Sequence, residues 1–359
     1  MRMDIYERLI NMDKNNIYQL ISKKMQDDES KSIFENRIRY SIQNSNEAIK
    51  SIIETTETAC WLEKILSQHK SEDILLYGAG RVSQYILNYC AERVCAIVDQ
   101  DINKQGKLLM GIPVISLQKA ISKYRKPYFL ISVKNNVEEI IKTLMRAKIA
   151  QRQIGCFYAH YFEMRQNQYF DLPYLLPGKD EVFVDCGAYH GETSEQFIKW
   201  CGGKYKHIYC FEPDRNNLAL CRKNLLDKVT RKHYTVINKG TWSGDGNLAF
   251  SDSSDETSHI IENGEKRIEV CSLDEELFEK RKETVTFIKM DIEGAELESL
   301  KGARKIIQEQ KPKLAICVYH KKEDIFDIPE YILSLNSEYK LYLRHYTLDE
   351  WDTVLYAIP

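Results

Sequence analysis

Three carboxylates follow an apolar run in the segment FIKMDIEGAE, residues 287–296. They belong to Asp291, Glu293 and Glu296, and a buried or half-buried carboxylate is unfavourable unless it meets a cation, a hydroxyl group or a metal ion. A general base, a metal ligand and an anchor for a hydroxyl group are therefore all open roles for Asp291 and Glu293. The alternative for Glu293 and Glu296 is to cap a helix that starts near Ala295, because acids favour helix N-termini.

Two histidines follow later strand-like runs, His320 in CVYHKKED and His345 in LRHYT. A lone histidine is more often structural, but ligands bind at the carboxyl ends of the strands in open α/β sheets, which favours a site at both positions. The unperturbed pKa of histidine is about 6.5, so a neutral His320 could accept a proton near neutral pH. We expect His320 and Asp291 to converge over one reacting group and His345 to lie further away.

A glycine turn between a strand and a helix is predicted in VFVDCGAYHGETSEQF, with Asp185, Gly187 and Gly191. Gly187 lets the backbone turn tightly and approach a ligand closely. Asp185 would repel a pyrophosphate and suits an ammonium group. Glu212, 27 residues further on (212 − 185), ends the next strand in CFEPD, where a carboxylate can accept both hydroxyls of a ribose. A tight turn with a surface acid is the alternative for each motif alone, but the two together predict nucleoside binding.

A second glycine turn lies earlier in the chain, in LLYGAGRVSQYIL. Gly78 and Gly80 occupy the first two glycine positions of a dinucleotide-binding fingerprint, and Ser83 stands at the third. Asp99 ends the next strand 19 residues after Gly80 (99 − 80), about right for a ribose contact. The segment is similar to Rossmann-type domains of nucleotide-sugar-binding and CoA-binding proteins. Binding of a nucleotide or an activated acceptor and a scaffold without a ligand are both open.

The chain divides into four parts with different patterns, an α/β organisation overall. We expect residues 1–70 to form helices that pack on a neighbouring domain or on a second copy in a homo-oligomer, residues 71–150 to form a Rossmann-like domain and residues 151–180 to connect it to a second domain, residues 181–359. The strand-like runs of the second domain are EVFVDCG (181–187), HIYCFEP (207–213), YTVINKG (234–240), TFIKMDIEG (286–294), KLAICVYH (313–320), YKLYLRHYT (339–347) and DTVLYAIP (352–359). The last two are too close for a crossover helix and must pair antiparallel, and residues 241–285 would be an insertion of short strands.

The composition excludes several classes of protein. Lys and Arg number 51 and Asp and Glu number 53, so the net charge of −2 gives no electrostatic reason to expect nucleic acid as a partner. No apolar run approaches the roughly 20 residues that span a bilayer, and the N-terminus lacks the apolar region of a secretory signal. The 10 cysteines are scattered singly without a CxxC pair, which favours a reducing cytoplasm.

Five motifs in order closely resemble the FkbM family of S-adenosylmethionine-dependent methyltransferases. They are VFVDCGAYHGETSEQF, YCFEPD, CSLDEEL, FIKMDIEGAELESLKGA and KPKLAICVYHKKEDIFDIP, and the resemblance covers about residues 165–359. It implies a class I methyltransferase fold, with six strands and an antiparallel seventh, and methyl transfer to a hydroxyl of a sugar or small natural product. The positions that it assigns to the cofactor are Asp185, Gly187, Gly191 and Glu212, with Trp242 and Ser243 of GTWSG near the adenine.

The resemblance also gives the carboxylates of KMDIEG a reaction to assist. The pKa of an acceptor hydroxyl is far above 7, so methyl transfer is helped by a base or by a metal ion that favours the alkoxide. We predict His320 and Asp291 as the catalytic pair, with Glu293 and His345 as contacts to the acceptor or to a divalent metal such as Mg²⁺.

The interpretation is therefore a cytoplasmic O-methyltransferase acting on a saccharide, a nucleotide sugar or a related small metabolite. One rival is a nucleotide-sugar or NAD-binding oxidoreductase, but residues 71–150 contain no Tyr-x-x-x-Lys couple for hydride transfer. Another is a binding protein whose methyltransferase-like domain is not catalytic.

Overall fold

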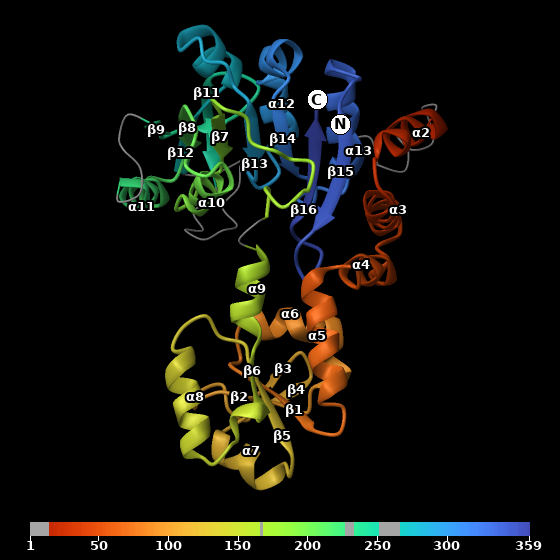
Figure 1. The fold of residues 1–359 in the computed structure, drawn as a ribbon, viewed down its shortest axis with the longest axis vertical. Helices are drawn as coiled ribbons and strands as arrows, with labels where there is room; N and C mark the ends of the chain where they lie inside the picture. Colours follow the sequence, from red (N-terminus) through yellow and green to blue (C-terminus); the bar gives the residue numbers. More distant parts are fainter. Residues whose placement is uncertain (1–13, 166–167, 227–232, 251–265) are drawn as a thin grey trace. The chain divides into compact units, whose positions relative to one another are not determined.

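The computed structural model describes residues 14–165, 168–226, 233–250 and 266–359, and it divides into two compact units. Unit 1 comprises Met1–Ser45, Tyr169–Arg344 and Asp352–Pro359, and unit 2 comprises Asn46–Gln168 and His345–Trp351. Each unit contains a large β-sheet flanked by helices (Figure 1). Among the described residues, no helix has both the length and the apolar character needed to cross a membrane.

Unit 2 is built on a six-stranded sheet with the order β3-β4-β2-β1-β5-β6. Its strands are β1 (Asp73–Tyr77), β2 (Ala96–Val98), β3 (Leu108–Leu109), β4 (Ile112–Ile115), β5 (Pro127–Ile131) and β6 (Ile154–Cys156). The pairs are parallel except that of β3 with β4. Parallel strands need crossover connections, and their runs of Ile, Leu, Val and Phe are typical of strands covered on both faces.

The helices of unit 2 bury one apolar side each against this sheet or against one another. They are α4 (Asn46–Ile53), α5 (Glu57–Gln68), α6 (Arg81–Cys90), α7 (Leu117–Lys123), α8 (Val137–Arg146) and α9 (Phe157–Arg165), with short 3₁₀ turns at Ala91–Arg93 and Gln151–Gln153. Polar caps set where some of them begin: Thr56 Oγ1 accepts the Ala59 N–H before α5, and Ser116 Oγ accepts the Lys119 N–H before α7.

Unit 1 is built on a seven-stranded sheet with the order β15-β16-β14-β13-β7-β8-β9. Its strands are β7 (Val182–Cys186), β8 (His207–Phe211), β9 (Tyr234–Ile237), β13 (Phe287–Met290), β14 (Lys313–Cys317), β15 (Lys340–His345) and β16 (Thr353–Ile358). The pairs from β9 to β14 are parallel, and β16 runs antiparallel to β14. The carboxyl ends of β7, β8, β13 and β14 therefore lie side by side at one edge of the sheet.

Helices and a small second sheet complete unit 1. The helices are α2 (Lys14–Lys24), α3 (Asp28–Gln43), α10 (Glu192–Trp200), α11 (Arg215–Leu226), α12 (Glu296–Lys301) and α13 (Asp324–Leu335), with π-helical turns at Asp274–Lys280 and Ile306–Gln310. The small sheet has the order β10-β12-β11, from β10 (Gly240–Thr241), β11 (Gly246–Phe250) and β12 (Lys266–Cys271). β11 and β12 lie in the stretch 241–285 expected to hold short strands, and β10 begins one residue before it. Residues 251–265 of that stretch are outside the described residues.

The units divide the chain differently from the four parts expected. The helices of the first 70 residues are shared, with α2 and α3 in unit 1 and α4 and α5 in unit 2. Specific polar contacts hold α3 in unit 1: Ser30 Oγ accepts the Leu343 N–H at 2.9 Å, and Arg344 Nη2 pairs with Asp27 at 2.8 Å. An amphipathic helix is stabilised by whichever core its apolar side meets, and the sequence of the helix does not specify that partner.

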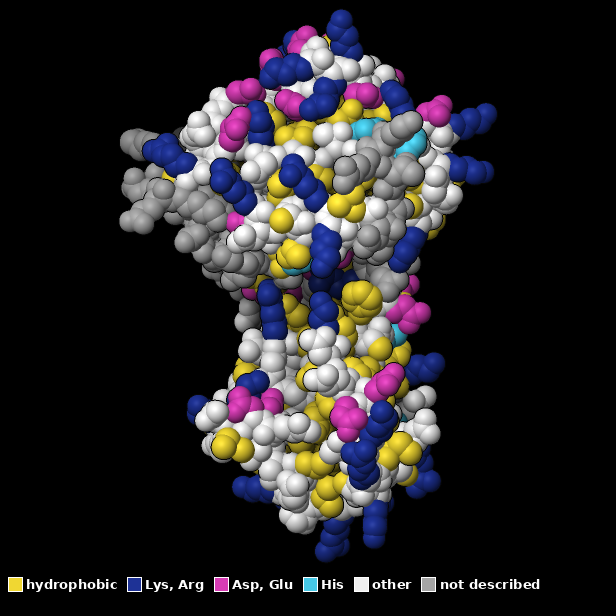
Figure 2. Space-filling model, turned by 90° about the vertical axis from the view of Figure 1, so that its left-hand side faces the viewer, with side chains coloured by type: hydrophobic (Ala, Val, Ile, Leu, Met, Phe, Trp, Pro, Cys, Tyr) yellow, Lys and Arg dark blue, Asp and Glu magenta, His cyan; other side chains and the backbone are white. Residues whose placement is uncertain are grey.

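Charged side chains of both signs occur on the face drawn in Figure 2. Figure 2 shows Lys and Arg side chains spread over the visible face, with Asp and Glu side chains between them.

Candidate active site

Asp185, at the end of β7, is fully buried and receives a cation from the chain itself. Lys289 Nζ lies 3.1 Å from Asp185 Oδ1, and Ser194 Oγ donates to Asp185 Oδ2 at 2.8 Å. Lys289 Nζ also donates to Gly187 O at 2.8 Å and to Cys186 O at 3.3 Å. Burial opposes the charge of Lys289, but Asp185 and Asp291 raise its pKa above the usual value. A ligand's ammonium was expected at Asp185, and the ammonium of Lys289 occupies that place.

The turn after β7 is held by backbone contacts that need glycine. Gly187 has φ +75° and donates its N–H to Phe211 O at 3.0 Å. A Cβ at Gly187 would collide with the carbonyl oxygen of Asp291, so a side chain is excluded by the end of β13 itself. Gly191, with φ +88°, occupies the N-cap of α10. The backbone conformation therefore favours glycine at both positions, whether or not a ligand binds.

Glu212 is buried at the end of β8 and joins two loops at the carboxyl edge. Its Oε2 accepts the Tyr189 N–H at 2.9 Å, and its Oε1 accepts the Asp214 N–H at 2.9 Å. Burial raises the pKa of Glu212 to about 7. Two carboxylate oxygens with one backbone donor each retain further acceptor capacity, which is what two ribose hydroxyls would use.

Trp242 and Ser243 follow β10, in the small sheet. The Trp242 N–H donates to Cys271 O at 2.9 Å, and its side chain packs against Ile268 and Val270. Ser243 is exposed and hydrogen-bonds to the side chain of Glu298, which helps to lower the pKa of that carboxyl. The structure therefore gives the indole a packing role and leaves the Ser243 side chain accessible to solvent.

The turn after β13 has an unusual backbone. Asp291 N donates to Cys186 O at 3.2 Å, and the strand ends at Met290. Glu293 has φ +55° and Gly294 φ +91°, so two successive residues adopt left-handed conformations before α12. A non-glycine residue in that region carries strain of about 1–3 kcal/mol, which the surrounding structure must stabilise. Residues two apart on a strand point to the same face, but β13 ends at Met290. This rule therefore does not apply to Asp291 and Glu293.

Asp291 is half-buried, with 26% of its side chain exposed, and is held by two tyrosines. Tyr169 Oη donates to Oδ2 at 2.9 Å, and Tyr319 Oη donates to Oδ1 at 3.1 Å. Burial alone would raise the pKa of Asp291, but Lys289, His320 and the two hydroxyls lower it below the usual value. This carboxylate is therefore ionised throughout the neutral range.

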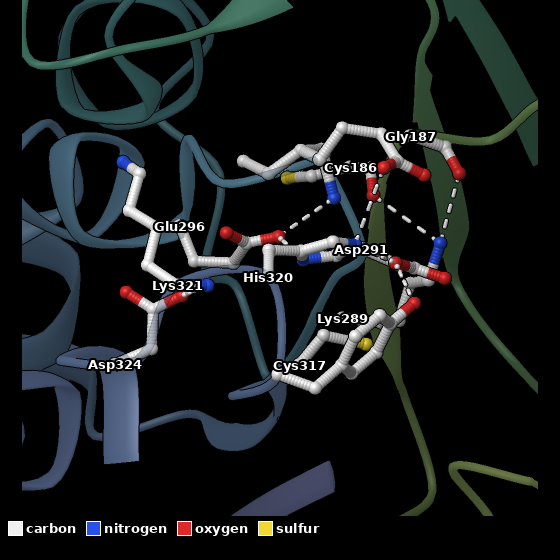
Figure 3. A network of polar contacts seen from close by, with 12 residues as sticks. Cys186, Gly187, Lys289, Asp291, Glu296, Cys317, His320, Lys321 and Asp324 are labelled. Atoms are coloured by element: carbon white, nitrogen blue, oxygen red, sulfur yellow. Dashed lines mark hydrogen bonds and ion pairs between the residues drawn. The ribbon is translucent and has the colours of Figure 1, made fainter. Parts of the chain in front are cut away.

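His320, in the loop after β14, lies among three carboxylates. Its Nδ1 is 2.9 Å from Glu296 Oε1, and its Nε2 is 3.5 Å from both Asp291 Oδ1 and Glu293 Oε2. Figure 3 shows the ring between Glu296 and Asp291. We call Asp291, Glu293, Glu296 and His320 the carboxylate–histidine cluster. Burial disfavours the cation, but Glu296 first, then Asp291 and Glu293, raise the pKa of His320 to about 10.

This pKa changes the role expected for His320. The sequence predicted a neutral imidazole that accepts a proton near pH 7, but a histidine with a pKa of about 10 is an imidazolium there. The shift arises because the chain surrounds the ring with carboxylates, which stabilise its charged form. His320 at neutral pH can therefore donate hydrogen bonds and supply positive charge, and it has no free lone pair for a proton.

Glu293 is the cluster member best suited to accept a proton. Its carboxyl is 31% exposed, and burial followed by the charges of Asp291 and Glu296 raises its pKa to about 7 against the opposing effect of His320. Glu296 is fully buried, and its Oε1 accepts the Ile292 N–H at 2.9 Å, so it reaches back into the turn before its own helix.

Ligand atoms of Asp291, Glu296 and His320 lie within 4.8 Å of one another, a spacing that a metal ion could bridge. Glu296 and Asp291 nevertheless address opposite nitrogens of the imidazole. A metal ligand must be a deprotonated nitrogen, so a metal ion here would have to displace a proton from His320. The arrangement fits a charged ring between two carboxylates better than a metal centre.

His345 is the last residue of β15 and the first residue of the second segment of unit 2. It is buried at the end of β15, the edge strand, and β16 and β14 separate β15 from β13.

The glycine turn of unit 2 brings its predicted residues together. Asp99 Oδ2 accepts the N–H of Ala79, which lies between Gly78 and Gly80, at 2.7 Å, and Lys104 Nζ lies 3.4 Å from the same oxygen. Backbone N–H groups and Lys104 outweigh burial and lower the pKa of Asp99.

The raised pKa of His320 predicts a pH dependence of stability. A histidine whose pKa is higher in the folded state stabilises that state fully below its unfolded value of 6.5, and the contribution disappears as the pH rises through about 10. The free energy of unfolding of the wild type should therefore decrease between pH 6.5 and 10 relative to that of His320→Gln. Urea unfolding at several pH values measures the difference, and a constant difference would contradict the assignment of the charge.

Lys289, Tyr169 and Tyr319 contribute to the site and were not predicted from the sequence. Lys289 has a visible signal, a lysine inside the apolar run FIKMD, but Tyr169 lies in the aromatic stretch YFDLPY more than 100 residues before Asp291. Only the fold brings its hydroxyl to the carboxylate.

Comparison with known proteins agrees with the C-terminal resemblance. Residues 185–345 match the family model described as Methyltransferase FkbM domain, and residues 70–155 match one described as C2185-like, N-terminal. The 2-O-methyltransferase NoeI of Sinorhizobium fredii is 26% identical over 151 residues, 37% of this chain and 61% of that protein, so the chain spans less than two thirds of this curated relative.

A solved structure shares the fold over most of the chain. The crystal structure of Methyltransferase FkbM from Methylobacillus flagellatus KT has a TM-score of 0.50 and 23% identity, and the alignment covers 88% of this chain and 98% of that one. The region 185–345 contains the whole carboxylate–histidine cluster, Lys289, Glu212 and the glycine turn after β7. The part of the chain that holds these residues therefore matches the FkbM methyltransferase domain.

Proposed function

We propose that unit 1 is a class I methyltransferase domain that transfers a methyl group from S-adenosylmethionine to a hydroxyl of a saccharide, a nucleotide sugar or a related small metabolite. The observation that carries the proposal is the match of residues 185–345 to the FkbM methyltransferase domain. The sheet order supports it, because antiparallel β16 inserted between β14 and β15 is the arrangement expected of a class I sheet. The 2-O-methyltransferase named among the relatives supports oxygen as the accepting atom.

Residues at the ends of β7 and β8 fit the donor in chemical type. Glu212 has the acceptor capacity for two ribose hydroxyls, and the turn at Gly187 brings backbone close to the same edge. Bound there, S-adenosylmethionine would supply a methyl group on a positively charged sulfur. Asp185 takes an indirect part, because it fixes Lys289 and, through it, the carbonyl groups of Cys186 and Gly187. We propose that Trp242 and Ser243 lie next to the adenine of the bound donor.

The carboxylate–histidine cluster would activate the acceptor. We assign Glu293 as the proton acceptor, because its carboxyl is partly exposed and a pKa of about 7 suits a base at neutral pH. Asp291 stays ionised and can accept a hydrogen bond from the acceptor substrate. The imidazolium of His320, 3.5 Å from both carboxylates, holds them together and offsets their repulsion. His345 is kept as a more distant contact to the acceptor.

Donor binding gives the first test. Calorimetry at pH 8, where Glu212 is ionised, should show binding of S-adenosylhomocysteine to the wild type, and Glu212→Ala should weaken it by about 1–3 kcal/mol, the range for hydrogen bonds to a charged group. Glu269→Ala, which removes a mostly exposed carboxylate of β12, should leave the affinity unchanged. The assignment fails if the wild type does not bind, or if both variants bind equally well.

Turnover is tested with a panel of sugars and nucleotide sugars and a labelled methyl donor. Label transfer to a hydroxyl supports the proposed reaction, whereas donor binding without transfer to any member favours a binding protein. A parallel assay with EDTA, and then with added Mg²⁺, tests whether activity depends on a metal ion. The geometry of the site does not require one. The turn of Gly78, Gly80 and Asp99 in unit 2 is kept as a candidate nucleotide site, and NAD and nucleotide sugars should be included as ligands for it.

A further inference from the structure

Residues 169–175, which we call the anchor segment, precede the region that matches the methyltransferase domain and are built into the core of unit 1. The Tyr169 N–H donates to Tyr356 Oη at 3.0 Å. The Phe170 ring lies 5.8 Å from that of Phe183 and 5.6 Å from that of Phe287, measured between centroids. Leu175 O accepts the Trp200 Nε1–H at 3.1 Å. These contacts fix the segment at both ends.

Tyr169 directs its side chain from this segment to the carboxylate–histidine cluster. Its hydroxyl donates to Asp291 Oδ2 at 2.9 Å, and its ring lies 5.5 Å from Lys289 Nζ. The residue is buried and has φ +76°, a left-handed conformation that a tyrosine rarely adopts. Such strain is retained where the surrounding structure fixes a conformation, and it is common near functional sites.

We infer that Tyr169 is a positioning residue for Asp291, an inference that rests on the proposed function. A carboxylate rotates readily about χ2, because the preference for any one angle is weak. Tyr169 holds Oδ2 and Tyr319 holds Oδ1, so the two hydroxyls together set the plane of the group. With that plane fixed, Asp291 presents one geometry to the acceptor hydroxyl beside Glu293. Without Tyr169, the carboxylate keeps its charge and samples other orientations.

Other charged groups around Asp291 do not replace this contact. Lys289 and His320 attract the carboxylate by charge, at 3.5 Å for His320 Nε2, but neither forms a hydrogen bond to it in this structure. The titratable groups that face it or its two tyrosines are Lys289 of β13, Glu293 of the same turn, Glu296 of α12, Cys317, Tyr319 and His320 at and after β14, and Asp352 before β16. Tyr169 and Tyr319 are the hydroxyl donors to it among the described residues.

The test is Tyr169→Phe, which removes only the hydroxyl. We expect kcat for methyl transfer to fall by about 10–100-fold, the fold-change for one hydrogen bond to a charged group, while the Kd for S-adenosylhomocysteine stays within about twofold. Tyr339→Phe is the matched control, because it also removes a buried hydroxyl of unit 1, one that donates to Pro312 O at 2.7 Å. This control should keep its kcat.

A double-variant comparison separates positioning from support of the fold. On the Asp291→Asn background, Tyr169→Phe should reduce kcat by less than about threefold, because residues that act through one another are not additive. An unchanged kcat in Tyr169→Phe, a full second loss on the Asp291→Asn background, or loss of donor binding would each overturn the inference while the methyltransferase assignment stands. A wild type that neither binds the donor nor transfers a methyl group would overturn both.

Discussion

Replacement of Glu293 by glutamine is expected to lower kcat for methyl transfer by about 10²–10⁴-fold, the usual contribution of a general base. Glutamine keeps the size of the side chain and lacks a carboxylate that can accept the proton. The Kd for S-adenosylhomocysteine should stay nearly unchanged, because the proposed donor contacts lie at the ends of β7 and β8. Initial rates with saturating donor, together with calorimetry, measure the two quantities separately.

The pH profile gives the same assignment a second check. The pKa of Glu293 is about 7, so kcat of the wild type should rise as the pH increases through 7 and level off above it. Glu212 has a pKa of about 7 as well, and its ionisation should act on donor affinity, which calorimetry across the same pH range records. Glu298→Gln is the matched control, a carboxylate of α12 that is 30% exposed and paired with Lys301. Equal rates for Glu293→Gln and Glu298→Gln would exclude Glu293 as the base.

The buried pair of Lys289 and Asp185 is expected to give the largest change in stability. Lys289→Met leaves the Asp185 carboxylate in the core without its cation, and Asp185→Asn leaves the Lys289 ammonium without its anion. Removal of one partner of a buried ion pair lowers the free energy of unfolding by about 3–5 kcal/mol. Urea unfolding of each variant, followed by tryptophan fluorescence, measures the loss.

The double variant Asp185→Asn/Lys289→Met distinguishes a mutual pair from two independent contributions. Because no uncompensated charge remains in the core, it should be destabilised by less than the sum of the two single variants, with a coupling of about 0.5–3 kcal/mol. Lys305→Met, which removes an exposed lysine paired with Glu279, should change the free energy of unfolding little. If the losses in free energy of unfolding were additive, Lys289 and Asp185 would stabilise the fold independently of each other. Donor binding by a stable double variant would show that the donor requires neither the Asp185 carboxylate nor its pairing with Lys289.

Much of the local structure follows from patterns in the chain. Alternating strand and helix patterns indicate parallel strands in both halves, and the short connection between the last two strand runs predicts that these two pair with each other. β15 and β16 are indeed neighbours in the sheet, and β16 runs antiparallel to β14. The turns at Gly78 and Gly187 and the carboxylates after β13 also stand out in the sequence, because glycines between a strand-like and a helix-like run and acids after an apolar run are distinctive patterns. Both glycines adopt positive φ in the structure. These features depend on residues close together in the sequence, which is why the sequence identifies them.

Charge states and partners depend on residues that are distant in the chain. Asp185 pairs with Lys289, His320 is charged by Glu296 and its neighbours, and Asp291 is held by Tyr169. A pKa depends on burial and on charges within a few ångströms, and neither can be calculated until the fold sets the distances. For that reason the chain alone predicted a histidine and an acid at one sheet edge. The three-dimensional structure surrounds that histidine with carboxylates, raises the pKa of Glu293, on which its proposed role as base rests, and brings a tyrosine from outside the matched domain to Asp291.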